Sequence, residues 1–286
     1  MKLTRRSAMA LAAASSLAAQ NRPIAEVKGN EVKHFVRFER GGRAAYGLLA
    51  GEFITELTAA PWAGGVAAGR SHNISAVKLL YPCEPSKVLA VGLNYKSHIG
   101  NRPAPTRPEF FFKPITCLQN PGDPIIIPKD SKNTHYEAEL VIVIGKKLKN
   151  VSRAEAEAGI FGYTCGNDVS ERDWQNGADK DLQWWRAKGA DTYGPMGPVI
   201  AAGFKPGPKM QISSRLNGEV KQKQVLSDLL FDCPAIVEFA ARYVTLVPGD
   251  VIFTGTPGST SAMKPGDTIE IEITGIGTLK NPVTMA

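Results

Sequence analysis

Residues 135–145 read HYEAELVIVIG, a polar start followed by an apolar and mostly β-branched run. The part from Leu140 to Ile144 has the composition of a buried strand that ends at Gly145. Because successive side chains of a strand point to opposite faces, Glu137 and Glu139 project from one side, about 6.5–7 Å apart. Two carboxylates this close repel one another unless a cation lies between them, and their oxygens suit a hard divalent metal. The spacing alone leaves a second interpretation open, in which both glutamates form the solvated face of an edge strand.

A third carboxylate for such a metal site is Asp168. It lies among turn-forming residues in the segment Gly166-Asn167-Asp168-Val169-Ser170. This segment follows a second short run with strand character, Ile160 to Cys165. We therefore expect Glu137, Glu139 and Asp168 to act together as the metal ligands.

Residues 21–84 have the pattern of a small N-terminal β domain. Two alternating runs, His34 to Phe38 and Ala45 to Leu49, flank a turn at Gly41-Gly42, as in a β-meander. We place the domain boundary at Pro85, so that residues 85–286 form the larger second domain. Nothing in the N-terminal domain has a catalytic pattern.

Residues 1–20 have the pattern of a removable signal peptide. Arg5 and Arg6 precede an Ala-rich apolar run that is shorter than the roughly 20 residues needed to span a bilayer. The adjacent arginines favour export through the twin-arginine route, which predicts a periplasmic protein. An ordinary secretory leader is the alternative.

Composition excludes several other classes of function. The net charge of +7 includes Lys2, Arg5 and Arg6, and the chain without its leader carries only +4 and no block of basic residues that would suit nucleic acid. No further apolar run reaches membrane length, so we expect no membrane contact after leader removal. The four cysteines are widely spaced without a CxxC pair, which argues against both a disulfide framework and a zinc motif.

A candidate general base lies in the second domain. Val88 to Gly92 is a continuous apolar run typical of a buried strand, and it leads into a polar loop that ends at His98. Histidine can accept a proton near neutral pH, although a single loop histidine is more often inert. The Pro-rich segment of residues 100–108 that follows could form a lid over a site.

Several motifs taken together resemble the fumarylacetoacetate hydrolase family over about residues 85–284. The motifs are Gly92-Leu93-Asn94-Tyr95-x-x-His98, Phe112-Lys113-Pro114, Tyr136-Glu137-Ala138-Glu139-Leu140, Gly166-Asn167-Asp168-Val169-Ser170-x-Arg172-Asp173-x-Gln175, Lys188, the run from Pro248 to Pro257, and Lys264-Pro265-Gly266-Asp267. The resemblance implies a mixed α/β, mainly β fold, with a β-roll catalytic domain of coiled sheets that usually forms a homodimer. It also implies that Glu137, Glu139 and Asp168 hold Mg²⁺ or Mn²⁺, and that the substrate is a small oxo acid.

The same resemblance implies roles for further residues. Lys188 matches a lysine that supplies positive charge to the developing oxyanion, and Arg172 and Gln175 match positions that contact substrate or metal-bound water. Thr256 matches a residue that contacts the substrate carboxylate. Without the resemblance, Arg172 and Gln175 would be read as a solvated helix face, and the segment around Thr256 as a simple turn.

One departure from the family pattern affects the expected reaction. Hydrolases of the family often carry a Glu three residues after the loop histidine, whereas this chain has Asn101, which cannot share the proton of His98. We expect hydrolysis of a C–C bond in a small 2-oxo or 1,3-dicarbonyl acid of the acylpyruvate type, through a metal-stabilised enolate. Isomerisation or decarboxylation of 2-oxo or 2-hydroxy-dienoate acids in aromatic degradation is the close alternative. A metal-stabilised binding protein without catalytic activity is a third alternative.

Overall fold

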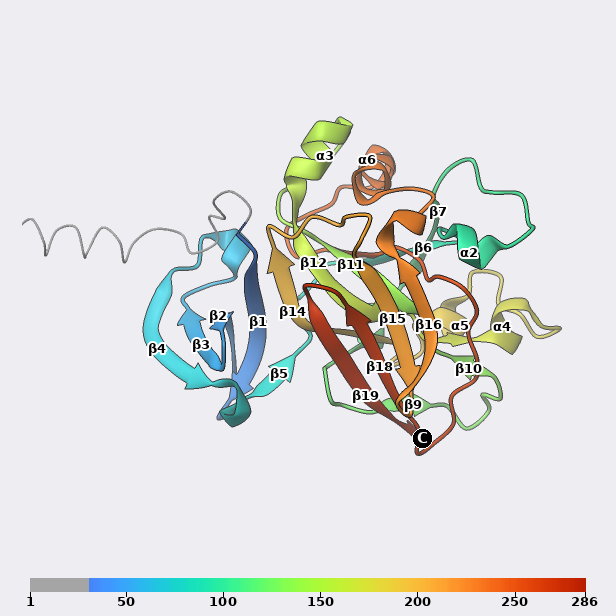
Figure 1. The fold of residues 1–286 in the computed structure, drawn as a ribbon, viewed down its shortest axis with the longest axis horizontal. Helices are drawn as coiled ribbons and strands as arrows, with labels where there is room; N and C mark the ends of the chain where they lie inside the picture. Colours follow the sequence, from blue (N-terminus) through green and yellow to red (C-terminus); the bar gives the residue numbers. More distant parts are fainter. Residues whose placement is uncertain (1–30) are drawn as a thin grey trace, which may run out of the picture.

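The apolar run that follows Glu139 forms the centre of a long sheet (Figure 1). In the computed structural model, which describes residues 31–286, strand β11 (Ala138–Ile144) is buried along its whole length. It pairs antiparallel with β12 (Ile160–Asn167) on one side and with β17 (Val251–Phe253) on the other. A strand that is covered on both faces favours apolar residues at every position, which explains the unbroken apolar run. The predicted leader, residues 1–20, lies outside the described residues.

This sheet contains 12 strands, ten of them in the order β4-β3-β2-β1-β14-β12-β11-β17-β6-β7, with β5 paired to β1 and β8 paired to β14. The strands not yet given bounds are β1 (Lys33–Arg40), β2 (Arg43–Ala50), β3 (Phe53–Leu57), β4 (Ala67–Asn73), β5 (Lys78–Leu80), β6 (Val88–Gly92), β7 (Glu109–Lys113), β8 (Leu118–Gln119) and β14 (Gly194–Ala202). The predicted buried strand at residues 88–92 is confirmed as β6, which pairs parallel with β17.

The predicted N-terminal meander is also confirmed. Strands β1 and β2 pair up to Arg40 and Arg43, and the two glycines between them have φ of +59° and +74°, as a tight two-residue hairpin turn requires. Strand β1 also pairs with β14, so one sheet runs across the boundary expected at Pro85. In Figure 1 strands β1–β4 lie to one side of the rest of the molecule. The boundary itself stays a prediction.

A second sheet of five strands packs against the first. Its order is β16-β15-β18-β19-β9, with bounds β9 (Ile125–Ile127), β15 (Gln211–Leu216), β16 (Glu219–Val225), β18 (Thr268–Ile273) and β19 (Gly277–Met285). Alternate residues of β18 are buried in the same apolar core as Leu140 and Ile142 of β11. A two-stranded ladder joins β10 (Thr134–His135) to β13 (Ser170–Glu171). The expected mixed, mainly β fold with coiled sheets is confirmed.

Helices are short and lie around the sheets. They are α2 (Lys96–Ile99), α3 (Arg153–Gly159), α4 (Arg172–Asn176), α5 (Trp185–Gly189) and α6 (Cys233–Tyr243), with 3₁₀ turns at Pro61–Ala63, Ile74–Ala76, Ile115–Cys117 and Leu226–Asp228. Helix α3 begins with a capping box, in which the Ser152 and Glu155 side chains satisfy the first backbone N–H groups. Within residues 31–286 no helix has the length and apolarity needed to cross a membrane.

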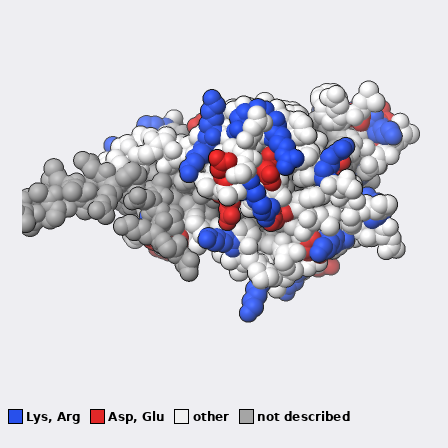
Figure 2. Space-filling model, turned by 90° about the horizontal axis from the view of Figure 1, so that it is seen from above, with Lys and Arg blue, Asp and Glu red and all other residues white. Residues whose placement is uncertain are grey.

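The structure also shows how charged side chains and cysteines are distributed. Figure 2 shows Lys and Arg side chains interspersed with Asp and Glu side chains on the face that it presents. All four cysteines are buried and unpaired, as the absence of a disulfide pattern predicts.

Candidate metal and active site

The predicted carboxylate triad comes together where β11 and β12 pair. Ala138 lies opposite Asn167, so Glu137 and Glu139 flank one end of the ladder while Asp168 follows directly after β12. One carboxylate oxygen from each of Glu137, Glu139 and Asp168 lies within 4.8 Å of the others, and all three residues are buried. The alternative interpretation of a solvated edge face is therefore wrong for both glutamates.

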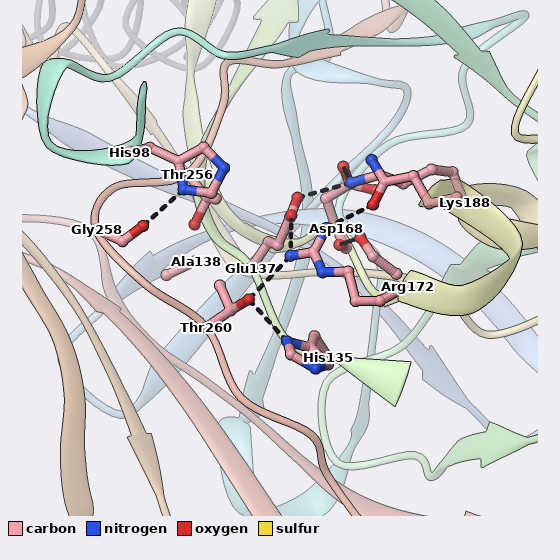
Figure 3. A network of polar contacts seen from close by, with 12 residues as sticks. His98, His135, Glu137, Ala138, Asp168, Arg172, Lys188, Thr256, Gly258 and Thr260 are labelled. Carbon is pink, nitrogen blue, oxygen red and sulfur yellow. Dashed lines mark hydrogen bonds and ion pairs between the residues drawn. The ribbon is translucent and has the colours of Figure 1, made fainter. Parts of the chain in front are cut away.

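Lys188 and Arg172 neutralise part of this negative charge (Figure 3). Lys188 Nζ, on α5, donates to Glu137 Oε2 at 2.7 Å and to Asp168 Oδ2 at 2.6 Å. Arg172 Nη2, on α4, donates to Glu137 Oε1 at 2.5 Å. Burial alone would raise the pKa of Glu137, but the charges of Lys188 and Arg172 outweigh burial and hold this pKa well below its usual range.

Lys113, the last residue of β7, is a third cation that sequence reasoning did not assign to the site. Its ammonium is buried and donates to Asp168 Oδ1 at 2.6 Å, and it also bonds the backbone carbonyls of Lys188 and Tyr193. Burial would lower the pKa of Lys113, but the adjacent carboxylate of Asp168 more than offsets it and the pKa is raised. A lysine inside the apolar run of residues 110–114 was the available signal, because a buried lysine requires a partner.

Glu139 differs from the other two carboxylates because no Lys or Arg of residues 31–286 forms an ion pair with it. Its Oε2 accepts a hydrogen bond of 2.7 Å from the backbone N–H of Gly255, whose φ of +100° favours glycine. Burial, and then the charges of Asp168 and Glu137, raise the pKa of Glu139 well above its usual value. A buried carboxylate that is costly to ionise, next to two carboxylates that pair with lysine or arginine, is the environment that a divalent cation fits.

The residues expected to contact substrate line a single cavity of about 170 Å³ above the triad. His98, Arg172, Gln175, Lys188 and Thr256 are all among its lining residues. Arg172 points inward and its Nη1 donates to Gln175 Oε1 at 2.6 Å, so the reading of α4 as a wholly solvated helix face is wrong for Arg172.

His98 lies on the short helix α2 rather than in the irregular loop that the sequence predicted. Its Nδ1 lies 2.6 Å from the carbonyl oxygen of Gly258, which can only accept, so in the neutral ring Nδ1 carries the proton and Nε2 is the nitrogen that can accept one (Figure 3). Ser97 ties α2 down by donating to Asp228 Oδ2 at 2.6 Å. Asn101 is exposed and does not line the cavity.

Thr256 is held by a residue that sequence reasoning missed. The side-chain amide of Gln222, on β16 of the second sheet, donates to Thr256 Oγ1 at 2.9 Å and to the Pro257 carbonyl at 2.6 Å. Gln222 Oε1 accepts from the backbone N–H of Ala138, between the two glutamates. Gln222 lies between two lysines in a polar strand, so no local pattern distinguished it.

Comparison with known proteins assigns the chain to a family. The model of the fumarylacetoacetate (FAA) hydrolase C-terminal domain matches residues 87–284, and the Rv2993c-like N-terminal model matches residues 33–82. This chain belongs to the fumarylacetoacetate hydrolase family. The family resemblance of the sequence motifs is thereby confirmed, and the match covers every candidate site residue.

Two relatives illustrate the range of this family. Protein Rv2993c of Mycobacterium tuberculosis is 45% identical over 233 residues, which cover 80% of this chain and 86% of the relative. The mitochondrial oxaloacetate tautomerase fahd2 of Xenopus laevis is 37% identical over 221 residues, covering 73% of this chain and 69% of the relative.

Two solved structures share the fold. A 5-carboxymethyl-2-hydroxymuconate delta-isomerase from Mycobacterium smegmatis superposes with a TM-score of 0.83 at 41% identity, covering 88% of this chain and 100% of that one. A maleylpyruvate hydrolase from Sphingobium sp. SYK-6, solved with manganese(II) and pyruvate, has a TM-score of 0.73 at 26% identity, covering 88% and 99%. The family thus includes hydrolases, isomerases and tautomerases, and family membership alone does not choose among them.

Proposed function

We propose that this chain is a divalent-metal enzyme that interconverts the keto and enol forms of a small 2-oxo acid. The observation that carries the proposal is the hydrogen bond of His98 Nδ1 to the Gly258 carbonyl. It leaves Nε2 of the neutral ring as a single base, and among residues 31–286 the His98 ring has no carboxylate as a hydrogen-bond partner. Moving a proton between carbon and oxygen needs one such base. Hydrolases of the family often support this histidine with a glutamate that helps it to activate water, and this chain has Asn101 at that position.

The triad of Glu137, Glu139 and Asp168 would hold Mg²⁺ or Mn²⁺, because hard ions prefer carboxylate oxygens. When bound, such an ion supplies a Lewis acid that stabilises negative charge on a substrate oxygen. The manganese(II) in the maleylpyruvate hydrolase structure supports this assignment.

Three side chains of the cavity would then handle the proton and the charge. His98 Nε2 would take a proton from the carbon beside the oxo group, which gives the enolate. A proton from solvent on the enolate oxygen would complete the enol, and the same two transfers in reverse would restore the oxo form. Lys188 uses two of its three N–H groups on Glu137 and Asp168, which leaves one for the oxygen that becomes negative. Thr256 accepts from Gln222, which leaves its own O–H to donate to the substrate carboxylate.

The relatives support enolisation and also keep a second candidate open. The tautomerase and the delta-isomerase are both enzymes whose names describe proton transfer without C–C cleavage. Hydrolysis of an acylpyruvate, the reaction that the sequence narrowly favoured, is the second candidate because a maleylpyruvate hydrolase shares the fold.

The test compares two substrates with the Mg²⁺-loaded and Mn²⁺-loaded protein. We expect the enol absorbance of oxaloacetate to relax faster than an acylpyruvate is cleaved. His98→Gln should slow the relaxation by about 10²–10⁴-fold, the usual contribution of a general base. His34→Gln is the matched control, because His34, on β1, contacts the carbonyl of Gly275 and does not line the cavity.

Two results would reject the proposal. Faster cleavage of the acylpyruvate would replace tautomerisation by hydrolysis. Turnover of neither acid by a protein that binds the metal would favour a binding protein without catalytic activity.

A further inference from the structure

Arg102 is an exposed residue that lines the cavity, three residues after the end of helix α2. Its Nε donates to the Ile99 carbonyl at 3.1 Å and its Nη2 to the His98 carbonyl at 2.9 Å. The guanidinium therefore bonds the last carbonyls of the same short helix that carries His98.

Arg102 differs from the other basic residues of the cavity because it forms no ion pair with a carboxylate of residues 31–286. The cavity is lined by three side chains of lysine or arginine, Arg102, Arg172 and Lys188. Arg172 pairs with Glu137, and Lys188 pairs with both Glu137 and Asp168. Within residues 31–286 no carboxylate forms an ion pair with Arg102, and its two hydrogen bonds to carbonyls leave three of its five N–H donors.

We propose that Arg102 binds a second, distal carboxylate of the substrate and thereby selects dicarboxylic 2-oxo acids, an inference that rests on the proposed function. A guanidinium with donors still available can hold a carboxylate in a two-point contact. The oxo-acid head would lie over the triad, and the cavity of about 170 Å³ suits a molecule of this small size. The same guanidinium donates to the His98 carbonyl. A carboxylate bound to Arg102 would therefore also hold helix α2, and with it the His98 side chain, over the substrate.

The test uses two ligands that cannot enolise, so binding is measured without keto–enol turnover. The dicarboxylate is a β-oxo acid that can lose CO₂ at a divalent metal, so its integrity is checked after each titration. They are 2,2-dimethyl-3-oxobutanedioate and 3,3-dimethyl-2-oxobutanoate, which share the oxo-acid head and differ in having a carboxylate or a methyl group at the far end. Calorimetric titration of the Mg²⁺-loaded protein gives both dissociation constants. Arg102→Gln should weaken binding of the dicarboxylate by about 10–100-fold, as the loss of charge-assisted hydrogen bonds predicts, and of the monocarboxylate by less than 2-fold.

Arg107→Gln is the matched control. Arg107 belongs to the same Pro-rich segment, is exposed, pairs with Glu109 at 3.4 Å and does not line the cavity. This variant should bind both ligands like the natural protein. Arg102→Lys should keep part of the preference for the dicarboxylate, because it retains the charge without the planar fork.

Three results would overturn the inference. Arg102→Gln could weaken the binding of both ligands equally, it could weaken the binding of neither, or the natural protein could bind the two ligands with equal affinity. The proposed function is judged separately, by turnover of oxaloacetate. A protein that discriminates between the ligands through Arg102 but turns over no oxo acid would keep the carboxylate site and reject the enzyme.

Discussion

Glu137 and Glu139 are two residues apart at the start of strand β11, but the charged groups around them differ. Glu137 accepts from Lys188 and Arg172, and its pKa lies well below the usual range. Glu139 accepts only from the Gly255 backbone, and burial followed by the neighbouring carboxylates raises its pKa. The described residues thus leave one carboxylate of the triad without a cation. We infer that the missing positive charge is the metal.

Lys113 provides a prediction at the residue scale. Lys113→Met removes a buried ammonium and leaves Asp168 and two backbone carbonyls with one donor fewer. We expect the free energy of unfolding to fall by about 3–5 kcal/mol, as when one partner of a buried ion pair is removed. Denaturant unfolding measures the change, and Lys132→Met, an exposed lysine, should stay within about 0.5 kcal/mol of the natural protein. Equal stability of both variants would show that Lys113 does not support the site.

The sequence predicted the candidate metal ligands better than the residues that hold the site together through hydrogen bonds and ion pairs. Glu137, Glu139 and Asp168 could be found because strand alternation and turn residues are local patterns. Lys113 and Gln222 could not be assigned, because their partners are 55 and 34 residues away along the chain. Contacts of that separation depend on how strands meet, which local periodicity does not encode.

At the scale of elements, the positions of the strands were easier to predict than the partners with which they pair. Strands β6, β11 and β12 follow their apolar runs, and the β1–β2 hairpin follows its two glycines. The pairing of β1 with β14 was not predicted, because both edges of a β-meander are available for pairing and the sequence does not say which edge is used. Helix α2 was expected as a loop, since four residues are too few for a helical pattern.

A buried carboxylate in the N-terminal strands, paired with two exposed arginines and a histidine, provides a prediction on pH. Glu56, on β3, is fully buried and accepts from Arg70 and His72 on β4 and from Arg43 on β2. The hydrogen bonds from Arg70 contribute most, and with His72 and Arg43 they outweigh burial and hold the pKa of Glu56 well below its usual value. A carboxylate with a lowered folded-state pKa stabilises the protein above its unfolded pKa of about 4.3 and loses this contribution as the pH falls further.

We therefore expect Glu56→Gln to lower the free energy of unfolding by about 1–3 kcal/mol at pH 7, because the arginines and the histidine lose an ionised acceptor. The deficit relative to the natural protein should shrink as the pH falls below about 4. Urea unfolding over a pH series measures both effects. Glu52→Gln is the control, because Glu52 is exposed on the turn before β3. A deficit that is independent of pH would contradict the electrostatic account.

At the scale of the whole molecule, two sheets share one apolar core, and the site lies where the ends of β11 and β12 meet segments from both sheets. The resemblance of the motifs predicted this mainly β architecture, and the family match confirms it. The homodimer that the resemblance implies stays a prediction, which sedimentation of the purified protein would test. Export also stays a prediction, because residues 1–20 lie outside the described residues.

The leader provides a prediction for the protein in the cell. Replacing Arg5 and Arg6 together by Lys keeps the charge of the leader but removes the twin-arginine pair. We expect the periplasmic fraction in a bacterial host to fall to background, as measured by cell fractionation. If residues 1–20 were instead an ordinary secretory leader, the substitution would not affect export, because such a leader needs only positive charge at its start. Unchanged export of the variant would therefore reject the twin-arginine route.

The metal site is the central claim, and Mn²⁺ titration of the natural protein and of Glu139→Gln tests it most directly. The amide keeps the shape of the side chain and removes the one negative charge of the triad that forms no ion pair with a lysine or arginine of residues 31–286. We predict one Mn²⁺ per natural chain, an affinity that falls by more than about 100-fold in the variant, and an equal loss of oxo-acid turnover. Glu52→Gln should bind Mn²⁺ normally. A Glu139→Gln variant that binds Mn²⁺ as tightly as the natural protein, or that turns over oxo acids without metal, would contradict the account.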